Sequence, residues 1–218
     1  MDQQSIDSLA KALKNHPHLQ HLAITDCYLG ADKIISIVEA LGKNQKLISL
    51  YLNSNAIENN AAKKVAELIV INKTLQEINL TSNRIEDAGC IALAEALQVN
   101  RALLELRLDN NRISDRGATR MAEALRSNDK LNLLSLQGCC ITRDGASPFV
   151  ETLKINRSLK YLYIAGNEID GSVIFDLAEA VKQNGLVKVD YRANKHVIRE
   201  FEELKRRYPG LEDRFIVR

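Results

Sequence analysis

The chain has 218 residues, of which 45% are apolar and 27% are charged, and its formal net charge at pH 7 is +2. This composition is typical of a soluble globular protein, and so small a net charge argues against a nucleic-acid partner. The first residues, MDQQSIDSLAKAL, carry acidic side chains where a signal peptide has basic ones, and no run of 18 apolar residues follows. We therefore expect neither a signal peptide nor a membrane span.

A helix is expected at the start of the chain. Residues 4–14 (QSIDSLAKALK) resemble the helix of a repeat whose strand is missing, because Leu13 stands six residues before Leu19, as Leu97 stands before Leu103. We expect residues 1–18 to form a helix that shields the first strand, either as a natural cap or as the cut end of a longer array. The nearby stretch HPHLQH holds three histidines, which could ligate zinc, but no carboxylate or thiol completes a set, so we expect no metal.

A period of 28 residues then organises residues 19–194 into about seven repeats. Its first column contains Leu19, Leu47, Leu75, Leu103, Leu131, Leu159 and, after a step of 27, Leu186. Apolar residues recur three and five positions after each of these leucines and form a second and a third column. The second and third columns stand two residues apart, as one face of a β-strand requires, so each repeat is expected to begin with a strand.

An asparagine column follows the strand in each repeat. It contains Cys27, Asn55, Asn83, Asn111, Cys139, Asn167 and Asn194. A buried asparagine at this point can satisfy the backbone groups of a bend, and cysteine, which is small and often buried, is a plausible substitute. An apolar residue two positions later, such as Ile85 or Ile113, is expected to close the turn side of the core.

The second half of each repeat is expected to be helical. In residues 91–97 (IALAEAL), for example, apolar residues recur three and four positions apart. A glutamate such as Glu95 recurs in the helices and is expected to face solvent. An asparagine at 44, 72, 100, 128, 156 and 184 is placed to end each helix.

The end of the chain breaks this rhythm. Residues 196–208 (HVIREFEELKRRY) predict a final helix, with Val197, Ile198, Phe201, Leu204 and Tyr208 as its apolar stripe, and Pro209 and Gly210 should stop it. Residues 211–218 are expected either to form an edge strand or to lie across the last repeat. Residues 195–218 thus predict a C-terminal cap.

The pattern LxxLxLxxNxI followed by xxxGxxxLAEALxxN resembles the ribonuclease inhibitor type of leucine-rich repeat. This type is also found in the receptor arms of NOD-like immune proteins, in Ran GTPase-activating protein and, in degenerate form, in tropomodulins. The resemblance implies an α/β leucine-rich repeat solenoid, or horseshoe, with parallel strands on the concave face and α-helices on the convex face. A single domain would then span residues 1–218.

The outward strand residues form a grid on the expected concave face, and the grid varies in chemistry. Acidic side chains are expected to gather around an arginine beside an apolar and aromatic patch. The expected partner-binding residues are Tyr51, Glu77, Glu105, Arg107, Asp109, Leu133, Tyr161 and Tyr163. Tyrosine and arginine are enriched in binding hot spots. The alternative is that exposed strands favour tyrosine anyway and that Arg107 merely neutralises Glu77 and Glu105.

These features favour a protein–protein interaction module that binds another protein through the concave face, as a monomer and without a cofactor. The chain has no Gly-rich phosphate loop, nucleophile elbow or metal-ligand set, so we do not expect an enzyme. The resemblances leave two alternatives open, a regulator of a small GTPase and a structural or filament-capping scaffold. The cysteines show no disulfide spacing. We expect a cytoplasmic protein, or one in the host cytosol if it is a bacterial effector.

Overall fold

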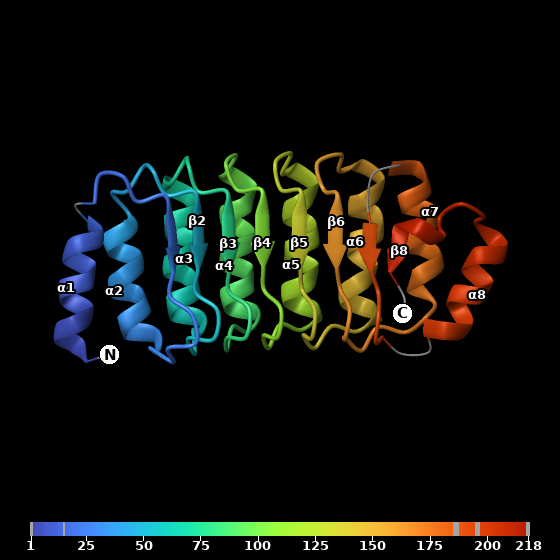
Figure 1. Ribbon diagram of the computed structural model, residues 1–218. Helices are drawn as coiled ribbons and strands as arrows, with labels where there is room; N and C mark the ends of the chain where they lie inside the picture. Colours follow the sequence, from blue (N-terminus) through green and yellow to red (C-terminus); the bar gives the residue numbers. More distant parts are fainter. Residues whose placement is uncertain (1, 15, 185–187, 195–196, 217–218) are drawn as a thin grey trace.

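The computed structural model describes residues 2–14, 16–184, 188–194 and 197–216, and no side-chain burial is assigned for residues 197–199 and 212. Within these residues, parallel strands form one layer and a row of helices forms the other (Figure 1). The strands are β1 (His21–Ala23), β2 (Ser49–Tyr51), β3 (Glu77–Asn79), β4 (Glu105–Arg107), β5 (Leu133–Ser135), β6 (Tyr161–Tyr163), β7 (Lys188–Asp190) and β8 (Phe215–Ile216). The helices are α1 (Gln3–Lys14), α2 (Ala31–Leu41), α3 (Asn59–Ile71), α4 (Asp87–Val99), α5 (Asp115–Ser127), α6 (Arg143–Ile155), α7 (Val173–Asn184), α8 (Val197–Arg207) and the short 3₁₀ helix η1 (Glu212–Arg214).

The sheet follows the sequence period directly. Each strand pairs with the next one along the chain, and up to β6 the register joins residues 28 positions apart, such as Leu22 with Leu50 and Leu106 with Leu134. Each strand returns to the next through a helix, as parallel pairing requires. The predicted α/β leucine-rich repeat solenoid is confirmed.

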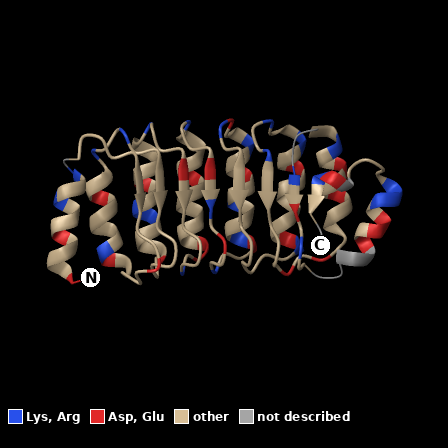
Figure 2. Cartoon of the chain, in the orientation of Figure 1, with Lys and Arg blue, Asp and Glu red and all other residues tan. Residues whose placement is uncertain are grey.

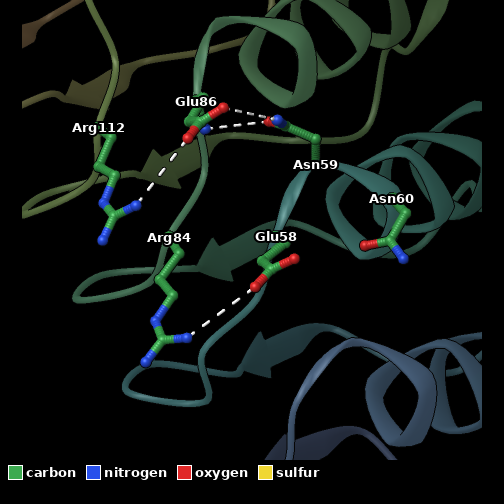
Figure 3. Close-up of a pocket in the computed structure, with 6 residues that line it drawn as sticks. All are labelled: Glu58, Asn59, Asn60, Arg84, Glu86 and Arg112. Carbon is green, nitrogen blue, oxygen red and sulfur yellow. Dashed lines mark hydrogen bonds and ion pairs between the residues drawn. The ribbon is translucent and has the colours of Figure 1, made fainter.

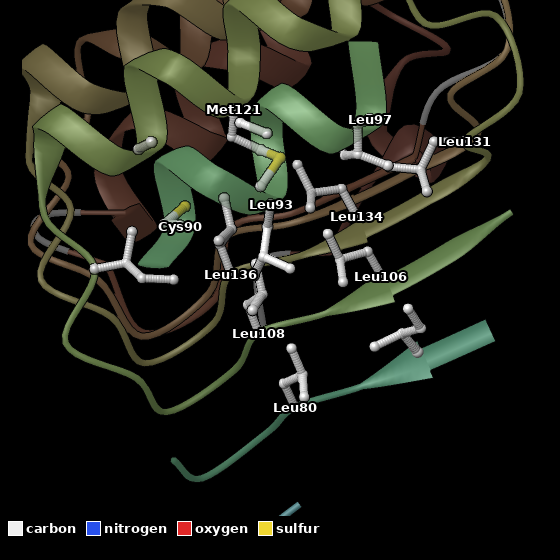
Figure 4. Close-up of a cluster of buried hydrophobic side chains, with 14 of the residues drawn as sticks. Leu80, Cys90, Leu93, Leu97, Leu106, Leu108, Met121, Leu131, Leu134 and Leu136 are labelled. Atoms are coloured by element: carbon white, nitrogen blue, oxygen red, sulfur yellow. The ribbon is translucent and has the colours of Figure 1, made fainter. Parts of the chain in front are cut away.

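The core lies between the two layers. Leu106 and Leu134 of the strands, and Leu80 directly after β3, belong to one buried cluster with Leu93 of α4 and Met121 of α5 (Figure 4). From Leu47 onward the described members of the three apolar columns are at most 1% exposed. At the N-terminal edge, Leu19, Leu22 and Ile24 are only partly buried. The reason is that β1 is the first strand of the sheet and has a neighbour on one side.

The asparagines after the strands lie where the sequence predicted. Asn111 is buried, its Oδ1 accepts the backbone N–H of Ile85 at 2.9 Å, and its Nδ2 donates to the carbonyl oxygens of Leu80 at 3.0 Å and Leu108 at 2.9 Å. Cys139 is buried at the equivalent point of the next repeat, and its Sγ donates to Leu108 O at 3.6 Å. Cys27 departs from the prediction, because it lies in the edge repeat and is exposed.

A second set of asparagines ends the helices, as predicted, and also joins successive repeats. Asn128 Oδ1 accepts the backbone N–H groups of Lys130 and Leu131 at 3.0 and 2.8 Å. Its Nδ2 donates backwards to Leu97 O at 2.7 Å and to Asn100 O at 3.3 Å. The same donation to the preceding carbonyl recurs along the chain. We call this set the amide ladder, made of Asn44, Asn72, Asn100, Asn128, Asn156 and Asn184.

The helix N-termini are also linked between repeats. Asp87, the first residue of α4, accepts the backbone N–H groups of Ser114 at 2.8 Å and Gly117 at 3.0 Å, and the Ser114 hydroxyl at 2.6 Å. It therefore satisfies free donors at the start of α5, the next helix. A Cβ at Gly117 would lie 2.7 Å from Asp87 Oδ1, so glycine is required by this close approach.

The C-terminal segment resolves one alternative left by the sequence. After α8 and the turn at Pro209 and Gly210, β8 pairs with β7 through Val189 and Phe215, so the edge-strand alternative is correct. Leu204 is buried, and Phe201 and Tyr208 pack against the core. His196 and the side chains of Val197 and Ile198 lie outside what the structure describes. The division into residues 1–18, 19–194 and 195–218 stays a prediction.

Candidate protein-binding face

The strands place the predicted binding residues on one face of the sheet. The register puts Glu77, Glu105, Leu133 and Tyr161 in one row across β3 to β6. A second row lies two residues further along the strands and crosses β2 to β6; it contains Tyr51, Asn79, Arg107, Ser135 and Tyr163. Figure 2 shows the acidic residues on β3 and β4, a basic residue on β4, and both kinds of charge again on β7.

The expected cluster of acids around Arg107 is only partly formed. Arg107 Nη2 lies 3.3 Å from Glu105 Oε2, which is one ion pair. Glu77 accepts a hydrogen bond from the Tyr51 hydroxyl, and this bond raises the pKa of Tyr51. Asp109 turns towards β5, where its Oδ1 accepts the Ser135 hydroxyl and the backbone N–H of Gln137. The acids are therefore divided among different donors: Glu105 pairs with Arg107, whereas Glu77 and Asp109 accept hydrogen bonds from other residues.

The aromatic patch is formed by two tyrosines. The ring centroids of Tyr161 and Tyr163 are 6.1 Å apart, and the rings are tilted by 49°. Tyr161 is 38% exposed, whereas burial raises the pKa of Tyr163. Leu133 departs from the exposed patch that the sequence suggested, because it is only 5% exposed. It lies between Glu105 and Tyr161 in the register, so the apolar surface offered to solvent comes from the tyrosines.

A hollow beyond the strand ends was not predicted. We call it the loop trough; it has a volume of about 610 Å³ and is lined by Thr81, Asp109, Asn110, Gln137, Gly138, Ala165, Gly166, Arg192 and Ala193. Asn110, Gly138, Gly166 and Ala193 share a positive φ of 53–65°. The sequence signal was the residue before each member of the asparagine column, which is small or polar in every repeat. That column contains Asp26, Ser54, Ser82, Asn110, Gly138, Gly166 and Ala193.

A smaller hollow of about 310 Å³ lies among the loops that lead into α3, α4 and α5 (Figure 3). Arg84 Nη1 lies 3.9 Å from Glu58 Oε1, and Arg112 Nη1 lies 4.0 Å from Glu86 Oε1. All four side chains are more than half exposed, so each pair contributes less than about 1 kcal/mol. Sequence reasoning did not single out these residues, and the hollow's charges largely compensate one another.

The three histidines near the N-terminus do not form a metal centre. His21 Nδ1 lies 2.6 Å from Ser49 Oγ, so this histidine has a hydrogen-bonding role on the sheet face. Among the described residues, no group of three or more histidine, cysteine, aspartate or glutamate side chains is arranged to hold a metal ion. No helix among the residues that the structure describes is long and apolar enough to cross a membrane.

Comparison with known proteins identifies the family. Residues 2–117 match the family model described as the TMOD/LMOD leucine-rich domain. The fold resembles leiomodin-1 actin-binding site 2, with a TM-score of 0.59 and 20% identity over 83% of this chain and 89% of that chain. It also resembles the tropomodulin C-terminal domain of Caenorhabditis elegans, with a TM-score of 0.57 and 18% identity over 83% and 93% of the two chains. A search of curated protein sequences gave no significant match. Because the family model covers more than half of the sequence, the chain belongs to the TMOD/LMOD leucine-rich domain family.

Proposed function

We propose that this domain is a non-enzymatic protein-binding module and that its partner is actin. The family match over residues 2–117 carries the proposal. The similar leiomodin-1 structure is described as an actin-binding site, which names the partner to test first. An actin partner would also agree with the predicted cytoplasmic location and with a monomeric domain, since one open face suffices to bind.

We propose the concave sheet face as the binding surface. Tyr161 offers exposed aromatic area, and Tyr163 supports its ring from the same strand. Arg107 and Glu105 lie two strands away and can exchange their mutual ion pair for groups on the partner, because both side chains are about one third exposed. Large tyrosines beside an arginine are the composition of a binding hot spot. Tyr51, Glu77 and Asp109 are held in place by the hydrogen bonds described above, and Leu133 is buried between Glu105 and Tyr161 in the register.

The first experiment is a titration of fluorescently labelled monomeric actin with the domain, followed by co-sedimentation with actin filaments. We expect the wild type to bind and a Tyr161→Ala, Tyr163→Ala double variant to bind at least about tenfold more weakly, because it loses the aromatic area of the hot spot. Glu95→Ala, on the outer face of α4, is the matched control and should bind like the wild type. A wild type that binds neither form of actin would refute the function. Equal binding by the double variant would refute only the site.

A structural or filament-capping role is the second candidate, because the chain shares its family with tropomodulin-type domains. Seeded elongation of labelled actin separates the two. A capper lowers the elongation rate from filament ends at domain concentrations far below that of actin, whereas a side or monomer binder does not. The GTPase-regulator alternative, and the closer resemblance to NOD-like receptor arms and Ran GTPase-activating protein, receive no support from the family match.

A further inference from the structure

We propose that the loop trough seats an extended segment of the bound partner, with a basic residue at its Asp109 end and an acidic residue at its Arg192 end. This inference rests on the proposed function and adds a second contact surface to the tyrosine patch, which is formed by Tyr161 and Tyr163. The segment would cross the strand ends from β4 to β7. Its recognition would differ from that of the flat sheet face, because here the partner's backbone lies in a hollow.

The floor of the trough admits a backbone. Gly166 has no side chain there, and Ala165 and Ala193 contribute only methyl groups. Gly138 also lacks a side chain, and the place that its Cβ would take is filled by the side chain of Asn110 from the preceding repeat. A close approach of two backbones is the circumstance in which residues without a Cβ are useful. The lining residues after β6 and β7 are therefore small in two neighbouring repeats.

The length of the trough fits a short extended segment. Asp109 and Arg192 follow strands β4 and β7, which are three strand spacings apart, or about 14 Å. The hollow of about 610 Å³ is open towards solvent along this length. An extended chain advances about 3.3 Å per residue, so about four or five residues span the trough.

The walls have opposite charge at the two ends. At one end Asp109 is fixed by its bonds to Ser135 and Gln137 and carries its carboxylate beside Thr81. At the other end Arg192 is held by two hydrogen bonds to the buried carboxylate of Asp190, at 3.0 and 2.7 Å. These bonds use two of its five donors, and its side chain is 47% exposed, so the guanidinium is both positioned and accessible. A basic and an acidic side chain four residues apart on the partner would complement this arrangement.

The trough is continuous with the tyrosine patch. Ala165 on its floor follows Tyr163 by two residues on the same extended stretch, and Gln137 follows Ser135 in the neighbouring repeat. A segment leaving the trough towards the strands therefore meets the rings of Tyr163 and Tyr161. One partner can occupy both places.

The test is actin binding by Gln137→Arg, which places a long side chain in the trough. We expect its affinity for actin to fall at least about tenfold, with Gln98→Arg on the exposed surface of α4 binding like the wild type as a matched control. Asp109→Asn keeps the acceptor for Ser135 and Gln137 but removes the charge, and we expect it to weaken binding and to flatten its salt dependence. If Gln137→Arg does not fold by circular dichroism, Ala193→Arg on the exposed floor repeats the test.

Three results have separate meanings. Unchanged affinity of a folded Gln137→Arg or Ala193→Arg variant overturns the trough and leaves actin binding intact. A wild type without affinity for actin overturns the proposed function, and the trough inference with it. Loss of affinity with Gln137→Arg but none with Asp109→Asn retains the extended segment and overturns the basic residue assigned to it.

Discussion

Replacing Asn111 with alanine tests the asparagine column most directly. The change removes the Oδ1 acceptor of the Ile85 N–H and the Nδ2 donor to the Leu80 and Leu108 carbonyl oxygens, all at 2.9–3.0 Å and all in buried surroundings. A buried group left without its partner costs about 1–3 kcal/mol. With one donor orphaned and two acceptors weakened, we expect the free energy of unfolding to fall by about 3 kcal/mol, at the top of that range.

The assay is urea unfolding followed by circular dichroism, with thermal unfolding alongside. For a domain of this size a loss of about 3 kcal/mol lowers Tm by about 6–12 °C. Two control variants are measured for comparison. Glu95→Ala, on the exposed side of α4, should change the free energy by less than about 0.5 kcal/mol. Asn111→Cys should cost less than Asn111→Ala, since Cys139 already fills the equivalent place in the next repeat. Equal costs for Asn111→Ala and Glu95→Ala would refute the assignment of the column.

Three further predictions concern packing and the thiols. Gly117→Ala would place a Cβ 2.7 Å from a carboxylate oxygen of the preceding repeat, so we expect it to lower the free energy of unfolding by about 1–3 kcal/mol in a urea titration; unchanged stability would contradict this contact. A thiol reagent at pH 8 should label exposed Cys27 and Cys140 in the folded protein, and Cys90 and Cys139 only after unfolding. Burial raises the pKa of Cys139 to about 12 from an ordinary 9.0, so the folded state favours the neutral thiol. Its stabilising contribution is full below about pH 9 and is lost as the pH rises towards 12, and a Cys139→Ser variant should lose that part of the alkaline decline.

The repeat columns made the fold predictable. Leucines at a fixed period, an asparagine three residues after the last strand column and a helix-forming second half constrain each unit in the same way, so local preference and global packing agree. The structure accordingly has Asn111 in the predicted place and Glu95 on the outer helix face. The prediction of a buried residue in the asparagine column was wrong at Cys27. A strand at the edge of the sheet has no preceding repeat within the described residues to bury its bend.

The face of the sheet was harder to predict, because outward position does not determine exposure. Leu133 points outward in the grid but is covered, whereas Tyr161 on the next strand is exposed. Hydrogen-bond partners were equally hidden: Asp109 was expected beside Arg107 and bonds to Ser135 and Gln137 instead. Side-chain exposure and hydrogen-bond partners depend on distances of a few ångströms between neighbouring strands. The repeat columns of the sequence do not give these distances.

The loop trough was missed for another reason. The glycines at 138 and 166 were visible in the sequence, but glycine alone does not distinguish a tight turn from a binding surface. The hollow is lined by small residues from neighbouring repeats, Gly138, Ala165, Gly166 and Ala193. These small residues line a common hollow only when the repeats are stacked in register.

The amide ladder also bears on how such an array can change in length. After the first member, Asn44, each side chain donates to the carbonyl group of the member before it, so the ladder has the same donor and acceptor at every step. Duplicating one 28-residue unit would add a donor and an acceptor together and leave no group unpaired, whereas an insertion of another length would interrupt the chain of amides. Gain or loss of whole 28-residue units therefore changes the length of the domain without leaving unpaired amides. Each added unit also adds one strand to the surface that the domain presents to a partner.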